Sequence, residues 1–163
     1  MEELLYDLIT LISNNLPYLS TVDEDYGQLE FIDQNDRDSY PLTFPAVLID
    51  APSTDWSDIA DLAQKGICQV RVRLIIDCYD DTHAHSKTTN RISNREAKRK
   101  ELHVLLQGFR TTGGGELIRK SSKFFTVNHG IKVYESTYTV SVSENVIDRR
   151  TVPKTKITLA VKP

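Results

Sequence analysis

The sequence contains little cysteine and no long apolar run, and each shortage excludes a class of protein. Its 163 residues include only two cysteines, Cys68 and Cys78. On one extended strand these two residues would lie about 33 Å apart, whereas a disulfide needs Cα atoms within about 7 Å. No stretch reaches the roughly 20 apolar residues of a membrane span, and the acidic start predicts no signal peptide. We therefore expect a soluble, cytosolic chain with two reduced, buried cysteines.

The chain does contain enough apolar material for one core. Hydrophobic residues make up 39% and charged residues 26% of the sequence, a balance typical of folded globular proteins. A length of 163 residues corresponds to one ordinary domain, or to a small domain with an extension. The net charge of −3 identifies no partner by itself.

The charge is divided unevenly along the chain. Residues 1–65 contain fourteen acidic and two basic residues, whereas residues 66–163 contain eighteen basic and nine acidic ones, so the two parts carry −12 and +9. They either neutralise each other inside one folded molecule or form separate acidic and basic faces. In the second case copies would attract one another head to tail, and such a contact closes into a ring when the rotation permits.

Two segments have the apolar spacing of amphipathic helices. Apolar residues recur at steps of three and four over residues 4–16. A second helix is predicted over residues 88–108, with Ser93 and Glu96 as a capping box and Gly108 at its end.

Four segments are predicted to be strands, over residues 44–50, 66–79, 117–128 and 131–144. The clearest is 66–79, where apolar residues occupy the even positions and mostly polar residues the odd ones. That alternation is typical of a sheet that helices cover on one face. We therefore predict an α+β fold with a mostly antiparallel sheet of long strands and helices packed on one face.

The connecting segments are less regular. We expect a further strand over residues 28–33, a helical turn or loop over 56–65, and a flexible loop at Gly113-Gly114-Gly115. The end of the chain is basic and has the composition of a strand, so it could add to its own sheet or to a neighbour's. We accordingly divide the chain into an α+β domain at residues 1–144 and a basic C-terminal extension at residues 145–163.

Residues that could perform catalysis or bind metal occur without the partners that such sites need. His83 and His85 could share a metal ion with Asp80, Asp81 or His103, but no third ligand follows at a recognised spacing. The triglycine segment lacks the Gly-Lys-Ser/Thr of a phosphate loop, and no second catalytic group lies beside Asp77. The sequence therefore predicts no catalytic residue, no cofactor and no metal, and a protein that is not an enzyme.

Basic residues gather on the second predicted helix, between Arg91 and Lys100. They could bind nucleic acid, an acidic partner or a sibling subunit, or form a solvated face with local ion pairs. Arg71 and Arg73 lie on the polar face of the predicted strand 66–79. A strand face that stays polar opposite a buried face is either solvated or in contact with another subunit.

Three short stretches resemble a known family. They are Tyr40–Val47 (YPLTFPAV) followed by Trp56-Ser57-Asp58, Gly66–Asp77 (GICQVRVRLIID) followed by a helix, and Tyr134–Val142 (YESTYTVSV). In this order they resemble the phage tail-terminator family, also called tail-completion or minor tail proteins, over roughly residues 1–144. Members of that family have a helix packed on a mixed or antiparallel sheet and assemble as hexameric rings.

The resemblance implies a virion structural protein. Its homo-oligomer, a hexameric ring, would cap the tail tube, stop its polymerisation and join it to the head or neck. The implied partners are the tail tube protein and a neck or head-completion protein, with no membrane contact and with DNA only passing through the lumen. We expect the protein in the host cytoplasm during assembly and in the virion tail or neck afterwards. The alternatives are a neck adaptor that contacts the portal, and a small nucleic-acid-binding protein that uses residues 91–100.

The predicted contact surface combines steering charges with apolar anchors. Exposed charge contributes orientation and association rate more than affinity, which must come from strand addition and apolar anchors. We expect the long strands to project beyond the core and line the ring. The candidate residues for the subunit or lumen interface are Arg71, Arg73, Arg95, Lys98, Arg99, Tyr134 and Tyr138.

Overall fold

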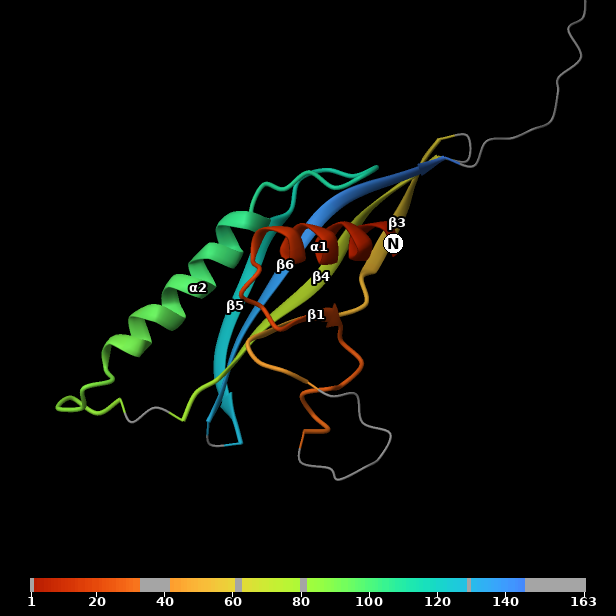
Figure 1. The fold of residues 1–163 in the computed structure, drawn as a ribbon. Helices are drawn as coiled ribbons and strands as arrows, with labels where there is room; N and C mark the ends of the chain where they lie inside the picture. Colours follow the sequence, from red (N-terminus) through yellow and green to blue (C-terminus); the bar gives the residue numbers. More distant parts are fainter. Residues whose placement is uncertain (1, 33–41, 61–62, 80–81, 129, 146–163) are drawn as a thin grey trace, which may run out of the picture.

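A computed structural model describes residues 2–32, 42–60, 63–79, 82–128 and 130–145, and Figure 1 shows their arrangement. Two helices and six strands occur within these residues. In chain order they are α1 (Glu2–Asn15), β1 (Thr21–Glu24), β2 (Ala46–Ile49), β3 (Ser53–Ala60), β4 (Ala63–Asp77), α2 (Asn90–Leu106), β5 (Ile118–Val127) and β6 (Ile131–Asn145). The predicted α+β class is confirmed.

The six strands form one sheet in the order β1-β2-β4-β6-β5, and β3 also pairs with β4. Only the short β1 and β2 run parallel, and the other pairs are antiparallel. β4 and β6 pair without interruption from Ala63↔Asn145 to Asp77↔Ile131. Figure 1 shows the ends of β3, β4 and β6 extending past α1 as a projecting arm. The predicted mostly antiparallel sheet of long strands is therefore confirmed.

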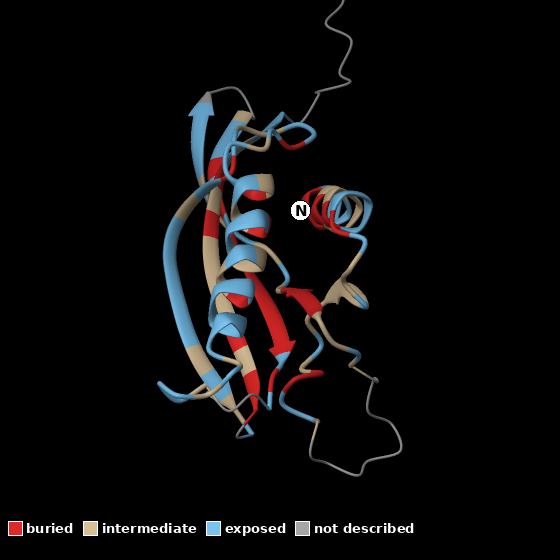
Figure 2. Ribbon diagram, turned by 60° about the vertical axis from the view of Figure 1, so that its left-hand side comes forward, coloured by how far each residue is buried: buried red, intermediate tan, exposed pale blue. Residues whose placement is uncertain are grey.

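The main core lies between the sheet and the two helices, which share one face (Figure 2). It forms because the even positions of β4 are apolar and all point to that face. Cys68 and Cys78 belong to this core and are buried as predicted, and neither is in a disulfide. The helices contribute buried leucines and isoleucines at the spacing seen in the sequence, namely Leu4, Leu5, Leu8 and Ile12 from α1 and Leu102 and Leu106 from α2.

A second, smaller core lies on the opposite face of the sheet. It joins Leu29 to buried side chains of the strands, namely Ala46, Leu48, Ile75, Ile131 and Val133. The prediction of a strand over residues 28–33 is wrong for the part described, because residues 28–32 form turns. The buried Gln28 explains this: its amide donates to the Glu24 carbonyl at 2.7 Å and accepts from the Tyr26 N–H at 2.7 Å. Such local side-chain hydrogen bonds compete with an extended backbone.

The segment predicted as a helical turn or loop at 56–65 is instead a hairpin of β3 and β4. Ser53 to Ala60 pair antiparallel with β4, with an irregularity after Asp58. The sequence STDWSD reads as a loop because serine and aspartate are poor strand formers. Pairing with β4 overrides that propensity. The ring of Trp56 lies over its cross-strand partner Gly66, where a Cβ would stand 3.1 Å from the ring atom Cε3. The short strand β1 was likewise not anticipated.

Two local predictions on and after α2 need correction. The helix begins at Asn90, so Ser93 and Glu96 lie inside it and form no capping box. The loop with three glycines is anchored rather than free, because Gly115 donates its N–H to the Ser141 carbonyl at 2.7 Å. The N–H of Thr112 also donates to Asp7 at 2.7 Å, which ties the loop to α1.

The predicted domain boundary falls at the end of β6. Asn145, the first residue of the predicted extension, still pairs with Ala63 as the last residue of β6. The remainder of the extension, residues 146–163, lies outside the described residues. Among the described helices, neither has the length and apolar character needed to cross a membrane.

Candidate subunit interface

A groove runs between α2 and the β5–β6 hairpin, and we call it the α2–β5 groove. Its volume is about 600 Å³. The helix supplies Ile92, Arg95, Glu96 and Arg99, the sheet supplies Ser122, Lys123, Phe124, Lys132, Tyr134, Glu135 and Ser136, and the segment between β4 and α2 adds Cys78 and Thr82. The side chains of Lys123 and Glu135 point to the opposite face, where Lys123 lies over Phe125 and Glu135 approaches Arg71. On the α2 side the groove therefore combines apolar side chains with three basic ones (Arg95, Arg99 and Lys132) and one acidic one (Glu96), a net charge of +2.

Two stacked aromatic rings form the apolar part of this groove. Phe124 and Tyr134 are direct cross-strand partners in the β5–β6 ladder. Their ring centroids are 4.7 Å apart at an interplanar angle of 19°. Phe124 is 57% exposed, which is unusual for a phenylalanine. Cross-strand pairing thus presents a partly exposed aromatic surface in the groove.

The basic residues of α2 differ in their surroundings. Arg95 is buried and donates from Nη1 to the sulfur of Cys78 at 2.8 Å. Arg99 donates from Nε to Glu96 at 2.7 Å, and this hydrogen bond lowers the pKa of Glu96. Lys98 lies on another side of the helix, with its ammonium 5.0 Å from the centre of the Tyr18 ring. That cation–π contact fixes α2 against the chain that follows α1.

Tyr138 lies beneath the second half of α2 and is only 1% exposed. Its hydroxyl is 3.1 Å from Nδ1 of His103. Burial raises the pKa of Tyr138 to about 12, while Arg119 and Arg99 act in the opposite direction. Burial also lowers the pKa of His103, with Arg119 and Arg99 adding to the effect. The pair therefore stays neutral near pH 7 and holds α2 on β6.

The remaining two predicted residues lie on the other face of the sheet. Arg71 forms an ion pair with Asp50 and approaches Glu135 at 3.8 Å. Arg73 is 5% exposed and forms ion pairs with Asp25 and with Glu30, the latter at 2.6 Å. Arg73 therefore contacts its own chain and offers little surface to a neighbouring subunit.

The ion pairs of Arg73 organise residues 23–31, which we call the acidic loop. Burial acts to raise the pKa of Asp25, but hydrogen bonds from Arg73 and from the Gly27 N–H outweigh it, so this pKa lies below its ordinary value. The hydrogen bonds that Arg73 donates to Glu30 and Asp25 likewise raise its own pKa against the effect of burial. The loop is thus held from inside by a charged pair that stays ionised.

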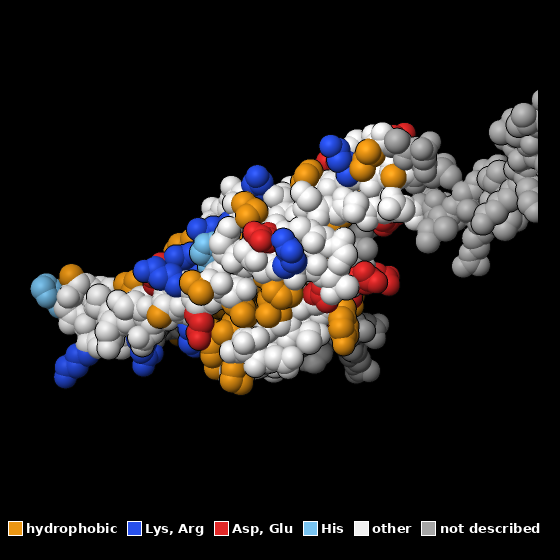
Figure 3. All heavy atoms as spheres, turned by 90° about the horizontal axis from the view of Figure 1, so that it is seen from above, with side chains coloured by type: hydrophobic (Ala, Val, Ile, Leu, Met, Phe, Trp, Pro, Cys, Tyr) orange, Lys and Arg blue, Asp and Glu red, His pale blue; other side chains and the backbone are white. Residues whose placement is uncertain are grey.

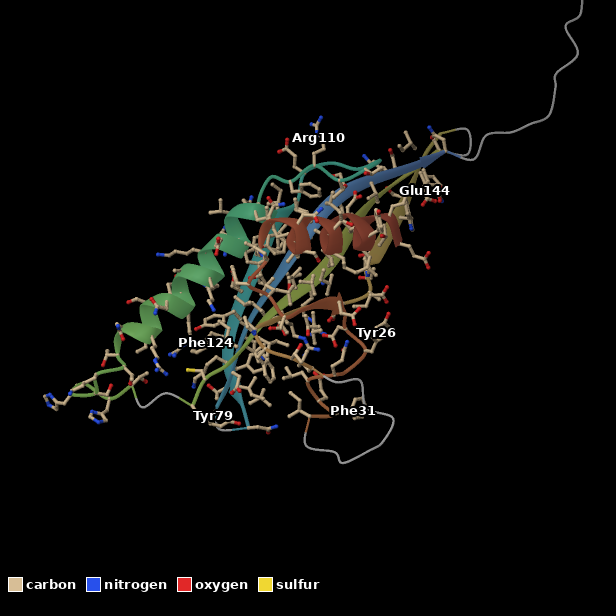
Figure 4. The ribbon with its side chains drawn as sticks, in the orientation of Figure 1. Tyr26, Phe31, Tyr79, Arg110, Phe124 and Glu144 are labelled. Atoms are coloured by element: carbon tan, nitrogen blue, oxygen red, sulfur yellow. The ribbon has the colours of Figure 1, made fainter. Side chains whose placement is uncertain are left out.

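Two aromatic side chains stand on the outside of this loop. Tyr26 is 54% exposed and Phe31 is 44% exposed. The ring of Phe31 lies over Gly27, where a Cβ would be 2.9 Å from the ring and where φ is +89°. A glycine is therefore needed at this position for both the turn and the ring. Figure 4 places Tyr26 and Phe124 at opposite edges of the sheet, beside β1 and β5 respectively.

The two interpretations of the uneven charge each describe part of the molecule. The acidic first part and the basic second part neutralise each other at Arg71 and Arg73, inside one protomer. Apart from the buried Arg95, the cations of α2 are exposed or partly exposed, and Figure 3 shows Lys and Arg gathered toward the α2 end of the molecule. The acidic loop contains four carboxylates and no basic residue. Acidic and basic surfaces therefore persist at separate places after the internal pairing.

Of the seven predicted contact residues, the structure brings Arg95, Arg99 and Tyr134 together in the α2–β5 groove. Phe124 and Lys123 of this groove, and Tyr26 of the acidic loop, were not anticipated. The turn signal at residues 129–130 was the available clue to Phe124, because it sets the register that places Phe124 opposite Tyr134.

The candidate metal ligands do not gather in one place. His83 and His85 are exposed, whereas His103 lies on α2 beside Tyr138. Among the described residues no group of three or more His, Cys, Asp or Glu side chains could hold a metal ion. Asp80 and Asp81, which the sequence grouped with His83, lie outside the described residues.

Comparison with known proteins gives matches among solved structures. No protein-family model matches the sequence, and no curated protein matches it. Among solved structures, a chain from the virion of a native gene transfer agent particle is similar to this one, with a TM-score of 0.46 and 12% sequence identity. The similarity covers 84% of each chain.

Proposed function

We propose that this chain is a virion structural protein that assembles head to tail into a tail-terminator ring, and that it is not an enzyme. One observation carries the proposal: a basic, aromatic groove lies on the β5 side of the sheet and an acidic, aromatic loop lies on the β1 side. Unlike surfaces on opposite sides of a protomer favour a heterologous contact, which generates a closed ring when the rotation permits.

The sequence motifs point to the same role. The stretches YPLTFPAV, GICQVRVRLIID and YESTYTVSV occur in the order seen in tail-terminator proteins. The second of these forms most of β4 and the third lies within β6, two of the three strands that form the projecting arm. In the proposed ring the arms stand side by side around the lumen, and the ring caps the tail tube.

Sedimentation velocity and negative-stain microscopy of the purified full-length protein test this function. We expect a ring of the protein alone, or a ring that forms when tail tube subunits are added, together with arrest of tube growth. A monomer under both conditions would refute the ring. A ring that binds portal protein and leaves tube growth unchanged would instead favour the neck adaptor.

A nucleic-acid-binding role is the second candidate, and the basic side chains of α2 favour it. Against this role, Glu96 lies among those side chains and pairs with Arg99 and Lys100. A binding protein that neutralises several phosphates loses affinity steeply as salt rises. Titration of duplex DNA at low and high salt separates the two functions, because the ring proposal predicts no saturable binding by the isolated protein.

A further inference from the structure

We propose that Tyr26 in the acidic loop of one copy inserts into the α2–β5 groove of the next copy and forms the central anchor of the ring contact. This inference rests on the proposed ring. It identifies the occupant of the groove as a second copy of this chain, and it assigns a contact role to residues that the sequence did not single out.

The acidic loop holds Tyr26 in an ordered position before any contact forms. The side chain of Tyr26 projects from a loop in which Gln28 hydrogen-bonds to the backbone at Glu24 and Tyr26. Arg73 holds the loop from below through Asp25 and Glu30. An anchor that is already ordered loses little conformational entropy when it binds, so more of its contact energy becomes affinity. Buried tyrosines are accordingly frequent among the residues that dominate interfaces.

The groove offers matching surfaces for such an anchor. Its aromatic floor is the stacked pair Phe124 and Tyr134, and Ile92 lies on the helix side. A third aromatic ring can pack against an exposed ring in an offset or edge-on arrangement, and an aromatic side chain buries about 150–250 Å² when it does so. The floor is polar at its edges, where Ser122 and Ser136 can meet a tyrosine hydroxyl.

The charges around the anchor and the groove are complementary. The acidic loop has four carboxylates, and the single charge of Arg73 leaves it at −3. On the α2 side the groove has three basic side chains and one acidic one, which leaves it at +2. Opposite signs steer the two surfaces together and disfavour the contact of groove with groove or of loop with loop. The contact is therefore directional, as a ring requires.

Photo-crosslinking with mass-spectrometric mapping tests the contact in the full-length protein. Tyr26 is replaced by the photoreactive aromatic p-benzoylphenylalanine, and isotopically labelled and unlabelled copies are mixed before irradiation. We expect cross-links between position 26 of one copy and residues 92–99 or 122–136 of another. The same probe at Tyr6, an exposed tyrosine on α1, is the matched control and should give no cross-link to those residues.

A second variant keeps the test independent of the probe. Phe124→Ala removes the exposed half of the aromatic floor, and because Phe124 is exposed the protomer should stay folded. We expect loss of the cross-links from position 26. We also expect the ring to dissociate at a higher protein concentration than the ring of the unchanged protein does. Val104→Ala, at an exposed position on α2, should change neither.

The possible results separate the Tyr26 contact from the proposed ring. A ring that forms while position 26 cross-links elsewhere, or to tube protein alone, overturns this inference and leaves the proposed ring intact. Absence of any oligomer, with and without tube subunits, overturns both.

Discussion

Replacing Arg73 by methionine is expected to destabilise the protein strongly. Methionine keeps most of the length of the side chain but removes the cation that Asp25 and Glu30 share. The Asp25 side chain is only 5% exposed, so it would remain buried without a partner. Breaking a buried ion pair from one side costs about 3–5 kcal/mol, because an uncompensated charge remains in the interior. That cost is a large part of the roughly 5–15 kcal/mol that stabilises a typical domain.

The assay is urea unfolding at pH 7, followed by far-ultraviolet circular dichroism. Arg71→Met is the matched control, because Arg71 lies on the same strand and the same face as Arg73. Its ion pair with Asp50 is partly exposed, and pairs of that kind contribute about 0–1 kcal/mol. We expect the double variant Arg73→Met with Asp25→Asn to recover part of the stability, since the orphaned carboxylate is then absent. Equal losses for the two arginine variants would refute the reasoning.

The pH dependence supplies an independent check. In the folded protein the pKa of Asp25 lies below its ordinary value. A lowered carboxyl pKa contributes stability that is present above the ordinary value of about 3.9 and is lost as the pH falls through the folded pKa. In the Arg73→Met variant the buried carboxyl has no cation, so its pKa should rise and its contribution should change sign. The stability difference between the two proteins should therefore shrink as the pH is lowered from 7 toward 4.

Three further substitutions test the helix face and its connections. Leu106→Ala removes a fully buried side chain from α2 and should cost about 2–5 kcal/mol in urea unfolding. Gly108→Ala adds a Cβ that meets no atom within 4 Å, but the position needs a φ of +80°, so backbone strain alone should cost about 1 kcal/mol. A neutral result would contradict the left-handed backbone conformation at Gly108. Tyr138→Phe loses the hydrogen bond to His103 and should cost about 0.5–1.5 kcal/mol, with no change expected if the two groups do not interact.

The long elements could be predicted from sequence because each has a single, uninterrupted period. In β4 the even positions are apolar from Cys68 to Ile76, and that alternation fixes both the strand and its buried face. In α1 the spacing of leucines and isoleucines does the same for a helix. The apolar periodicity of these elements identifies the face that packs in the core, without knowledge of which distant segment packs against it.

Elements that depend on a distant partner could not be predicted in this way. β3 is rich in serine and aspartate and becomes a strand only because β4 returns beside it. Arg73 occupies a polar position in the alternation of β4, and it is buried because the acidic loop, more than forty residues earlier, folds across that face. Tertiary contacts decide the state of both segments, and a local pattern does not contain them.

The buried Arg73 also links the fold to the proposed assembly. The sequence placed this residue at a subunit surface because an arginine on a strand face suggests an external partner. Its partners are Asp25 and Glu30 of the same chain, so part of the uneven charge of the sequence is consumed in shaping the acidic loop. The loop then presents Tyr26 on the outside with its remaining negative charge, while the cations of α2 stay on the opposite side of the sheet. The ion pairs inside the protomer therefore order the acidic loop, and the ordered loop is the surface that the proposed contact with the next copy requires.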